Sequence, residues 1–229
     1  MKNKVIGKLQ SYILPQNEKY SEPDGIVILI HGYGANGRDL LSLADNWIKD
    51  MPALAFVSPD APDECEASSL GRQWFSLQNF DRESKEREIA TAWNHLSDYI
   101  DAVMDEYKIS DDKILLCGFS QGTMMALYTA MKREKPCAGV LGYSGMLLDK
   151  NLVQTTENKD IPIHLIHGMA DTVIPINEWE NAFKTLRSNG FKVSGYKAKG
   201  LGHGIDFEGI DSGYYFIKDC MYPAKKNTA

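Results

Sequence analysis

Short apolar runs recur along the chain and are separated by longer stretches in which apolar and polar residues follow a helical period. The runs occupy residues 26–30, 53–57, 114–117, 138–143, 161–167 and 191–198. Apolar runs of about four to eight residues are typical of strands buried on both faces of a sheet. Nearer the N-terminus, residues 5–14 predict an edge strand or a hairpin.

Helical spacing is clearest over residues 84–107. One side of that predicted helix carries large apolar side chains, namely Ile89, Trp93, Leu96, Ile100, Val103 and Met104. Further helices are predicted over 40–51, where Pro52 ends the pattern, and over 123–132, 177–189 and 206–221. Strands that alternate with helices predict an α/β fold, with a mainly parallel sheet covered by helices on both faces.

Two segments show neither a short apolar run nor a helical period. Residues 59–82 form a connection much longer than is usual in a compact domain, which favours a functional loop. Residues 151–159 suggest a polar connection. We find no repeat, linker or low-complexity segment, so we expect a single domain over residues 1–229, with 223–229 as a frayed tail.

Composition narrows the class of protein. The chain has 229 residues, of which 43% are hydrophobic and 24% charged, as in ordinary soluble domains. A net charge of −6 without a basic stripe argues against a nucleic-acid partner. No apolar run is long enough for a transmembrane segment, and no signal peptide follows the N-terminus. The four cysteines show no framework spacing, so we expect free thiols and a cytoplasmic protein.

The strongest chemical signal is Gly-Phe-Ser-Gln-Gly at residues 118–122, between a predicted strand and a predicted helix. This strand–turn–helix setting is that of a nucleophile elbow, which exposes a serine hydroxyl at the start of a helix. The alternative role for Ser120 is that of a helix N-cap. A serine hydroxyl is a weak nucleophile and needs a neighbouring base.

His203 and Asp171 are the candidate base and acid. Both follow predicted strands, and functional loops gather at the carboxyl ends of parallel strands. We expect Gly202 and Gly204, which lack side chains, to let His203 approach closely. Asp171 could instead serve as a turn or cap aspartate, and His203 could be structural. The order serine, aspartate, histidine along the chain is that of α/β-hydrolases.

Asp160 and Asp206 compete with Asp171 for the acid role. Asp160 precedes its predicted strand, which puts it at the wrong end of the sheet, and Asp206 precedes the last predicted helix. The oxyanion hole would use the backbone N–H groups of Gln121 and Tyr33. Because the backbone supplies both donors, replacing the Gln121 side chain should cost less activity than replacing Ser120.

The remaining histidines and Cys117 have structural interpretations. His31 and His167 end strands and should hydrogen-bond within their own loops, and His95 belongs to a helix face. His164 and His167 are three apart on a strand and therefore face opposite sides, so we expect no metal site. Cys117 lies on a core strand and should be inert packing.

Five motifs together resemble one known family. They are His-Gly-Tyr-Gly-Ala-Asn-Gly at 31–37, Arg-Gln-Trp-Phe at 72–75, the elbow at 118–122, His-Gly-Met-Ala-Asp-Thr-Val-Ile-Pro at 167–175, and Gly-His-Gly at 202–204. In this order they resemble the phospholipase/carboxylesterase family, which includes acyl-protein thioesterases and bacterial carboxylesterases. The resemblance covers residues 26–217. Two positions differ: Tyr33 stands where members often carry leucine, and Ser76 where many carry aspartate.

The resemblance implies an α/β-hydrolase fold and hydrolysis of esters or thioesters without a cofactor. It assigns Ser120, Asp171 and His203 to a catalytic triad, and Tyr33 and Gln121 to the oxyanion hole. Since His203 must be neutral to act as a base, activity should rise with pH between roughly 6 and 7.5.

We expect an apolar acyl pocket that favours short to medium chains. Its predicted lining is Trp74, Phe75, Leu77, Met146, Leu147, Met169 and Val173. The inserted segments are too short for a large cap domain, so lysophospholipids or acylated proteins could reach the site. Alternatives are a peptidase or an acyltransferase on the same fold, or a hydrolase-like receptor without turnover. A homodimer is compatible with the sequence.

Overall fold

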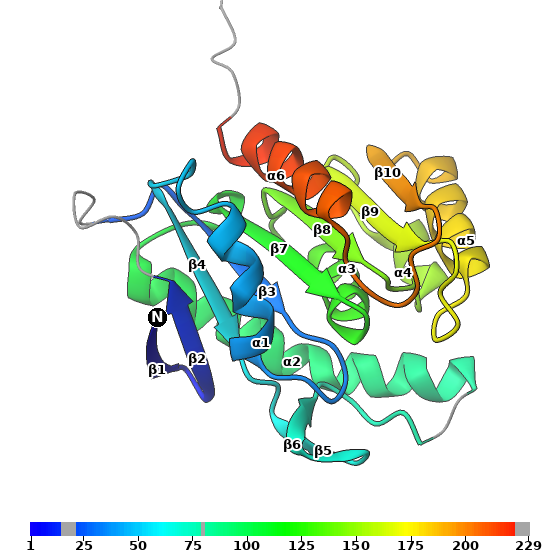
Figure 1. Ribbon diagram of the computed structural model, residues 1–229, viewed down its shortest axis with the longest axis horizontal. Helices are drawn as coiled ribbons and strands as arrows, with labels where there is room; N and C mark the ends of the chain where they lie inside the picture. Colours follow the sequence, from blue (N-terminus) through cyan, green and yellow to red (C-terminus); the bar gives the residue numbers. More distant parts are fainter. Residues whose placement is uncertain (15–21, 79–80, 223–229) are drawn as a thin grey trace, which may run out of the picture.

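The computed structural model describes residues 1–14, 22–78 and 81–222, and its centre is an eight-stranded sheet (Figure 1). The strand order is β1-β2-β4-β3-β7-β8-β9-β10. The strands are β1 (Lys2–Ile6), β2 (Leu9–Leu14), β3 (Gly25–Ile30), β4 (Leu54–Pro59), β7 (Ile114–Phe119), β8 (Gly139–Tyr143), β9 (Ile163–Gly168) and β10 (Val193–Ala198). The six strands β4, β3, β7, β8, β9 and β10 pair in parallel. At one edge, β1 and β2 form an antiparallel hairpin, and β2 also pairs antiparallel with β4. The mainly parallel α/β fold is confirmed.

Helices cover both faces of the sheet (Figure 1). They are α1 (Gly37–Leu41), α2 (Arg82–Tyr107), α3 (Gln121–Lys132), α4 (Lys150–Thr155), α5 (Ile176–Ser188) and α6 (Phe207–Met221). Two hydrophobic clusters fill the two interfaces: α2, α3, α4 and α5 contribute to one, and α1 and α6 to the other.

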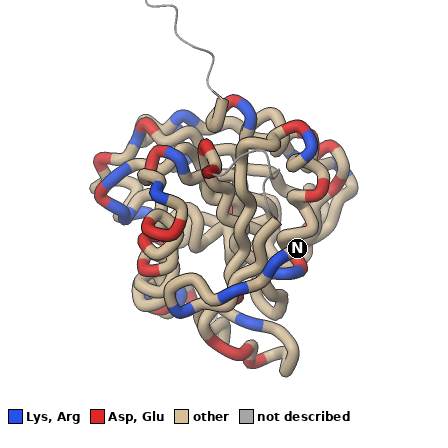
Figure 2. The backbone as a smooth tube through the Cα atoms, turned by 90° about the vertical axis from the view of Figure 1, so that its left-hand side faces the viewer, with Lys and Arg blue, Asp and Glu red and all other residues tan. Residues whose placement is uncertain are grey.

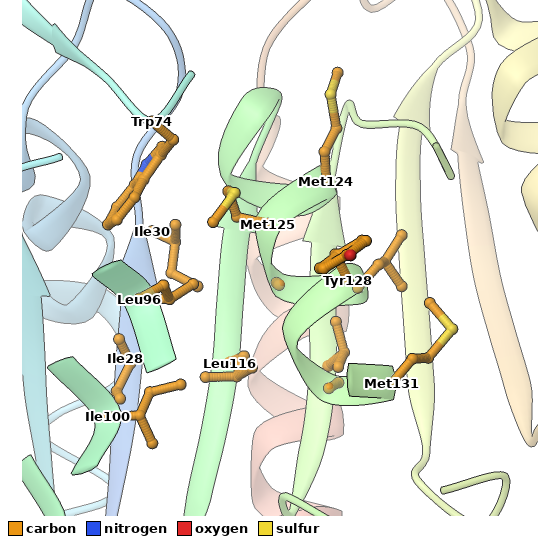
Figure 3. Packing of buried hydrophobic residues seen from close by; sticks show 14 of the residues in the cluster. Ile28, Ile30, Trp74, Leu96, Ile100, Leu116, Met124, Met125, Tyr128 and Met131 are labelled. Atoms are coloured by element: carbon orange, nitrogen blue, oxygen red, sulfur yellow. The ribbon is translucent and has the colours of Figure 1, made fainter. Parts of the chain in front are cut away.

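Strand β3 shows why an unbroken apolar run is needed at the centre. Ile28 and Ile30 point into the first cluster, whereas Val27 and Leu29 point into the second. Successive side chains of a strand alternate between the faces of the sheet, so a strand covered on both sides must be apolar throughout. Figure 3 shows Ile28 and Ile30 beside residues of the long helix α2 in the first cluster.

Three predicted segments differ from the structure. The loop predicted over 59–82 contains a hairpin of β5 (Asp63–Cys65) and β6 (Ser68–Gln73), whose largely exposed, polar strands carry no apolar period. The helix predicted over 40–51 is only the short α1 followed by a 3₁₀ turn at Ser42–Asn46. The polar connection at 151–159 contains α4, which Asp149 caps by accepting from Leu152 N. The predicted tail at 223–229 lies outside the described residues.

The distribution of charged residues and the state of the cysteines agree with what the composition predicts. Figure 2 shows lysine and arginine interspersed with acidic residues rather than gathered in one stripe. All four cysteines are free thiols, as predicted. Within the described residues, no helix combines the length and the apolar character needed to cross a bilayer.

Candidate active site

The predicted elbow is a sharp turn between β7 and α3. Ser120 occupies it with φ 54° and ψ −117°, a conformation that residues with side chains rarely adopt. Its N–H donates to Tyr143 O of β8 at 2.9 Å. A Cβ on Gly122 would lie 1.8 Å from Ile30 O, so only glycine fits where α3 crosses β3. Ser120 stands at the N-cap position of α3, but its side chain makes no capping bond to the helix.

Ser120, His203 and Asp171 form one continuous chain of hydrogen bonds. Ser120 Oγ lies 3.0 Å from His203 Nε2, and His203 Nδ1 lies 2.7 Å from Asp171 Oδ2. The Asp171 side chain is fully buried, whereas that of His203 is 19% exposed. Since a carboxylate only accepts, Nδ1 carries the imidazole hydrogen and Nε2 is free to accept the serine proton.

Asp171 is held in place by three hydrogen-bond donors, His203 Nδ1 and two backbone N–H groups. Its Oδ1 accepts from Val173 N at 2.8 Å and Ile174 N at 2.9 Å, so it is a turn aspartate as well as the partner of His203. Burial alone would raise its pKa, but the bonds from His203, Ile174 and Val173 outweigh burial and lower the pKa below the ordinary value. The carboxylate therefore stays ionised opposite the imidazole.

Asp171 also lies beside His167, for which the sequence predicted only a loop role. His167 Nε2 lies 2.8 Å from Ile174 O, as predicted for a bond within the loop, and also 3.3 Å from Asp171 Oδ2. Its side chain is fully buried, and Nδ1 has no partner among the described residues. The spacing of four residues between His167 and Asp171 was the available signal, but only the turn after β9 brings the two together.

The competing aspartates are engaged elsewhere. Asp160 is exposed and pairs with Lys192 at 3.0 Å. Asp206 caps α6 by accepting from Gly209 N at 2.8 Å. Of the three candidates, Asp171 is the one that reaches His203.

The backbone beside Ser120 supplies two free donors. A Cβ on Gly32 would lie 3.2 Å from the Ser120 Cβ, so the loop after β3 runs directly against Ser120. In the described part of the chain, neither Tyr33 N nor Gln121 N donates to a backbone or side-chain acceptor. Gln121 N also begins α3, where the helix dipole favours negative charge.

Two structural predictions nearby are confirmed. His31 is fully buried, with Nδ1 2.7 Å from Gly32 O, and its Nε2 accepts from Ala61 N at 3.0 Å. Burial lowers the pKa of His31, so the ring is neutral. Cys117 is completely buried, and burial raises the pKa of its thiol far above the usual range.

The side chains predicted to line an acyl pocket occupy three different environments. Trp74, Phe75 and Leu147 are buried in the first hydrophobic cluster, and Leu77 and Met146 pack against it while partly exposed. Met169 and Val173 are 48% and 66% exposed on the loop after β9. The pocket assignment stays a prediction.

Metal chemistry finds no support in the arrangement of ligands. His164 lies between Ser194 Oγ at 2.7 Å and Ser212 Oγ at 2.8 Å and stacks on Phe216, on the face opposite His167. Across residues 1–14, 22–78 and 81–222, no group of three or more histidine, cysteine or acidic side chains could hold a metal ion.

Comparisons with known proteins point the same way. The family model described as phospholipase/carboxylesterase matches residues 16–221. Acyl-protein thioesterase 1 of Gibberella zeae is 25% identical over 234 residues, covering 95% of this chain and 98% of the relative. Acyl-protein thioesterase 1 homolog 1 of Dictyostelium discoideum is 29% identical over 203 residues, covering 85% and 90%. The crystal structure of esterase PE8 is similar with a TM-score of 0.87 at 30% identity, covering 93% of this chain and 99% of that one.

Proposed function

Because this chain belongs to the phospholipase/carboxylesterase family, a family of serine hydrolases, we propose that Ser120, His203 and Asp171 are the triad with which it cleaves carboxylic esters or thioesters. The observation that carries the proposal is the unbroken hydrogen-bond chain from Ser120 Oγ through His203 to Asp171. The serine conformation supports it as well, since strained backbone tends to cluster at active sites.

The proposed reaction has two halves. His203 Nε2 takes the hydroxyl proton while Ser120 Oγ attacks the carbonyl carbon, and the resulting tetrahedral adduct collapses with cleavage of the C–O or C–S bond. His203 passes its proton to the departing alcohol or thiol. Water then attacks the acyl-enzyme with His203 again as base, which releases the carboxylic acid and restores the serine. Asp171 stabilises the imidazolium in both halves.

Tyr33 N–H and Gln121 N–H are the proposed oxyanion donors. Both are backbone groups next to the nucleophile, and neither has another partner in the described chain. Donors that are fixed before the reaction stabilise a developing charge without reorganisation, and losing one typically costs ~10²–10³-fold in rate.

The proposed substrates carry short to medium acyl chains. Met169 and Val173 present exposed apolar surface beside Asp171, and Leu77 and Met146 are partly exposed. An apolar slot contributes ~0.8 kcal/mol per buried methylene, about fourfold in affinity per carbon until the slot is full. Lysophospholipids or acylated proteins are the proposed natural classes, and the free cysteines support a cytoplasmic location.

The decisive experiment combines covalent labelling with turnover. A fluorophosphonate should label Ser120 and no other residue, as mapped by mass spectrometry, and the protein should hydrolyse p-nitrophenyl butyrate. Ser120→Ala should abolish the label and lower kcat by at least ~10⁴-fold. Labelling without turnover would favour a receptor, and a loss below ~10-fold in the alanine variant would reject the triad.

Chain length and acceptor define the substrate class. We expect kcat/KM to rise from p-nitrophenyl acetate to butyrate and then to level off or fall by octanoate. Equal values across the series would count against an apolar slot. Analysis of the products with added alcohol or amine separates hydrolysis from acyl transfer, and a peptide panel tests for peptidase activity.

A further inference from the structure

One short segment of the chain contacts both of the loops that carry the oxyanion donors. This bridging segment comprises residues 71–75, at the end of β6 and just beyond it. On one side it pairs with the loop after β3, where Gly34 N donates to Arg72 O at 3.0 Å and Arg72 N donates to Ala35 O at 2.8 Å. A Cβ on Gly71 would lie 2.2 Å from Gly34 O, so the two backbones cross in direct contact.

On its other side the bridging segment is held by the Gln121 side chain. Gln121 Oε1 accepts from Trp74 N at 2.9 Å, and Gln121 Nε2 donates to Phe75 O at 2.8 Å. The residue is only 1% exposed. The amide thus pairs with the main chain through both of its ends, as a neighbouring strand would.

A third bond closes the connection back to the loop after β3. Trp74 Nε1 donates to His31 O at 3.0 Å, and the indole is buried beside the His31 ring. Figure 3 shows Trp74 packed above Ile30 at the end of β3. The bridging segment is therefore fixed to the start of α3 by Gln121 and to the end of β3 by Trp74.

We propose that the Gln121 side chain is a positioning residue that, through the bridging segment, fixes the distance between the Tyr33 and Gln121 backbone donors. This inference rests on the proposed function of those two N–H groups. The donors belong to segments far apart in the sequence, and the loop after β3 is rich in glycine and flexible by composition. A misplacement of about 1 Å at a reacting centre can cost ~10²-fold in rate, so a rigid connection between the donors has catalytic value.

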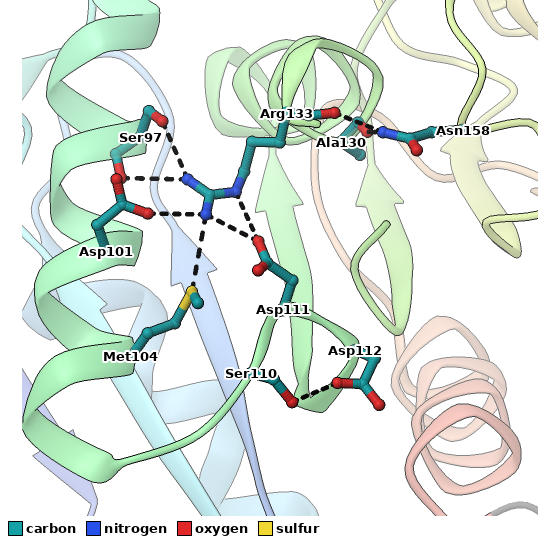
Figure 4. Close-up of polar contacts among 9 residues, drawn as sticks. All are labelled: Ser97, Asp101, Met104, Ser110, Asp111, Asp112, Ala130, Arg133 and Asn158. Atoms are coloured by element: carbon teal, nitrogen blue, oxygen red, sulfur yellow. Dashed lines mark hydrogen bonds and ion pairs between the residues drawn. The ribbon is translucent and has the colours of Figure 1, made fainter. Parts of the chain in front are cut away.

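A buried amide at the C-terminal end of α3 provides a matched control for Gln121. Asn158 is also a buried amide, at 9% exposure, and its Nδ2 donates to Ala130 O at 3.2 Å and to Arg133 O at 2.6 Å. Figure 4 shows it beside Ala130 and Arg133, at the C-terminal end of α3. Loss of either amide leaves buried main-chain groups unpaired and lowers stability. Only loss of the Gln121 amide should change the chemistry.

The test compares Gln121→Met with Asn158→Leu, with rates expressed per active site titrated by the fluorophosphonate. Gln121→Met keeps the backbone donor and the side-chain volume. We expect kcat to fall by about 10- to 100-fold with little change in KM, and the affinity for an alkyl boronic acid, which forms a tetrahedral adduct on serine, to fall by a similar factor. Asn158→Leu should lower Tm yet leave both quantities within about twofold.

Trp74→Phe is a second test of the bridging segment, at its attachment to His31. It removes the bond to His31 O but keeps an aromatic ring, so kcat should fall in the same direction by a smaller factor. The double variant should lose less than the product of the two single effects, because both act through one segment.

Two results would overturn the inference while leaving the triad intact. One is a Gln121→Met enzyme whose kcat and boronic acid affinity match those of Asn158→Leu. The other, which decides the matter if Gln121→Met does not fold, is a Trp74→Phe enzyme with an unchanged kcat and boronic acid affinity. Failure of the proposed function itself would show in Ser120→Ala instead.

Discussion

The two ends of helix α3 use buried polar groups in opposite ways. At the C-terminal end the last carbonyls are occupied by side chains from the connection after α4: Asn158 donates to Ala130 O and Arg133 O, and Thr156 Oγ1 donates to Met131 O at 2.7 Å. At the N-terminal end, Gln121 N has no acceptor in the described chain. One end of the helix is satisfied, and the other is left open.

The two ends of α3 also differ in the charged residues around them. Beyond the C-terminal end, Arg133 binds Asp111 at 2.8 Å and Asp101 at 2.7 Å, and it also contacts Ser97 and Met104 (Figure 4). The N-terminal end carries no acidic residue in its first turn, and Ser120 stands there in a strained conformation. A helix start with unpaired N–H groups is suited to receive negative charge from outside. Helix α3 thus has a C-terminal end whose polar groups are paired within the protein and an N-terminal end that is free to bind an anion.

Substitutions at residue 120 should produce the largest effects. Ser120→Gly and Ser120→Ala should both lose at least ~10⁴-fold in kcat. Glycine accepts a positive φ and alanine does not, so Ser120→Gly should be more stable than Ser120→Ala by ~1 kcal/mol. Urea denaturation measures the difference. Equal stabilities would show that no strain is stored at the turn.

At the C-terminal end of α3, removing the Arg133 guanidinium should lower the free energy of unfolding without lowering kcat. Arg133→Met leaves the Asp111 carboxylate, 7% exposed, without its cation and should cost about 3–5 kcal/mol of unfolding free energy. The kcat of the folded enzyme should not change. Lys192→Met, which breaks the exposed pair with Asp160, is the control and should cost under ~1 kcal/mol. A marked loss of kcat in Arg133→Met would end the division between the two ends.

Lowering the pH should weaken the fold around the buried His31. Burial lowers the pKa of His31 below the ordinary value near ~6.5, so its stabilising contribution is complete above that pH and is lost as the pH falls toward the folded-state pKa. Protonation would also remove the bond from Ala61 N. Tm should therefore fall as the pH decreases below about 6.5, and less steeply in His31→Gln. His95→Gln, an exposed change, should keep the wild-type slope.

Substitution of the glycines beside His203 should have the smallest effect on activity and stability. A Cβ on Gly202 would meet nothing closer than 4.0 Å, and one on Gly204 nothing closer than 3.9 Å. The sequence-based explanation, that these glycines let His203 approach, is therefore wrong, because both positions have room for a side chain. Gly202→Ala should change kcat/KM by under ~3-fold and stability by under ~1 kcal/mol. Gly122→Ala, by contrast, should not yield a native fold.

The sequence was most informative where one local pattern determines one element. The apolar runs located the strands of the main sheet, and the elbow motif with the order Ser120, Asp171, His203 predicted three side chains that the structure does join. The hairpin of β5 and β6 was missed because β5 has only three residues and neither strand carries an apolar run.

Contacts between distant segments could not be predicted in the same way. The Gln121 amide pairs with residues 74 and 75, and nothing in either stretch indicates the other. His167 likewise reaches Asp171 only through the turn after β9. Side-chain roles of this kind depend on how two loops cross, which is a property of the assembled sheet.

The proposed nucleophile Ser120 follows β7, the proposed acid Asp171 follows β9 and the proposed base His203 follows β10, which is one of the two edge strands of the sheet. A slip of one residue in any of these pairings would move the side chains of that strand to the opposite face of the sheet and displace the residues that follow it. Ester turnover therefore requires the complete sheet. During refolding, activity should return only after β10 has paired with β9, and a nascent chain should become active only once β10 has been added.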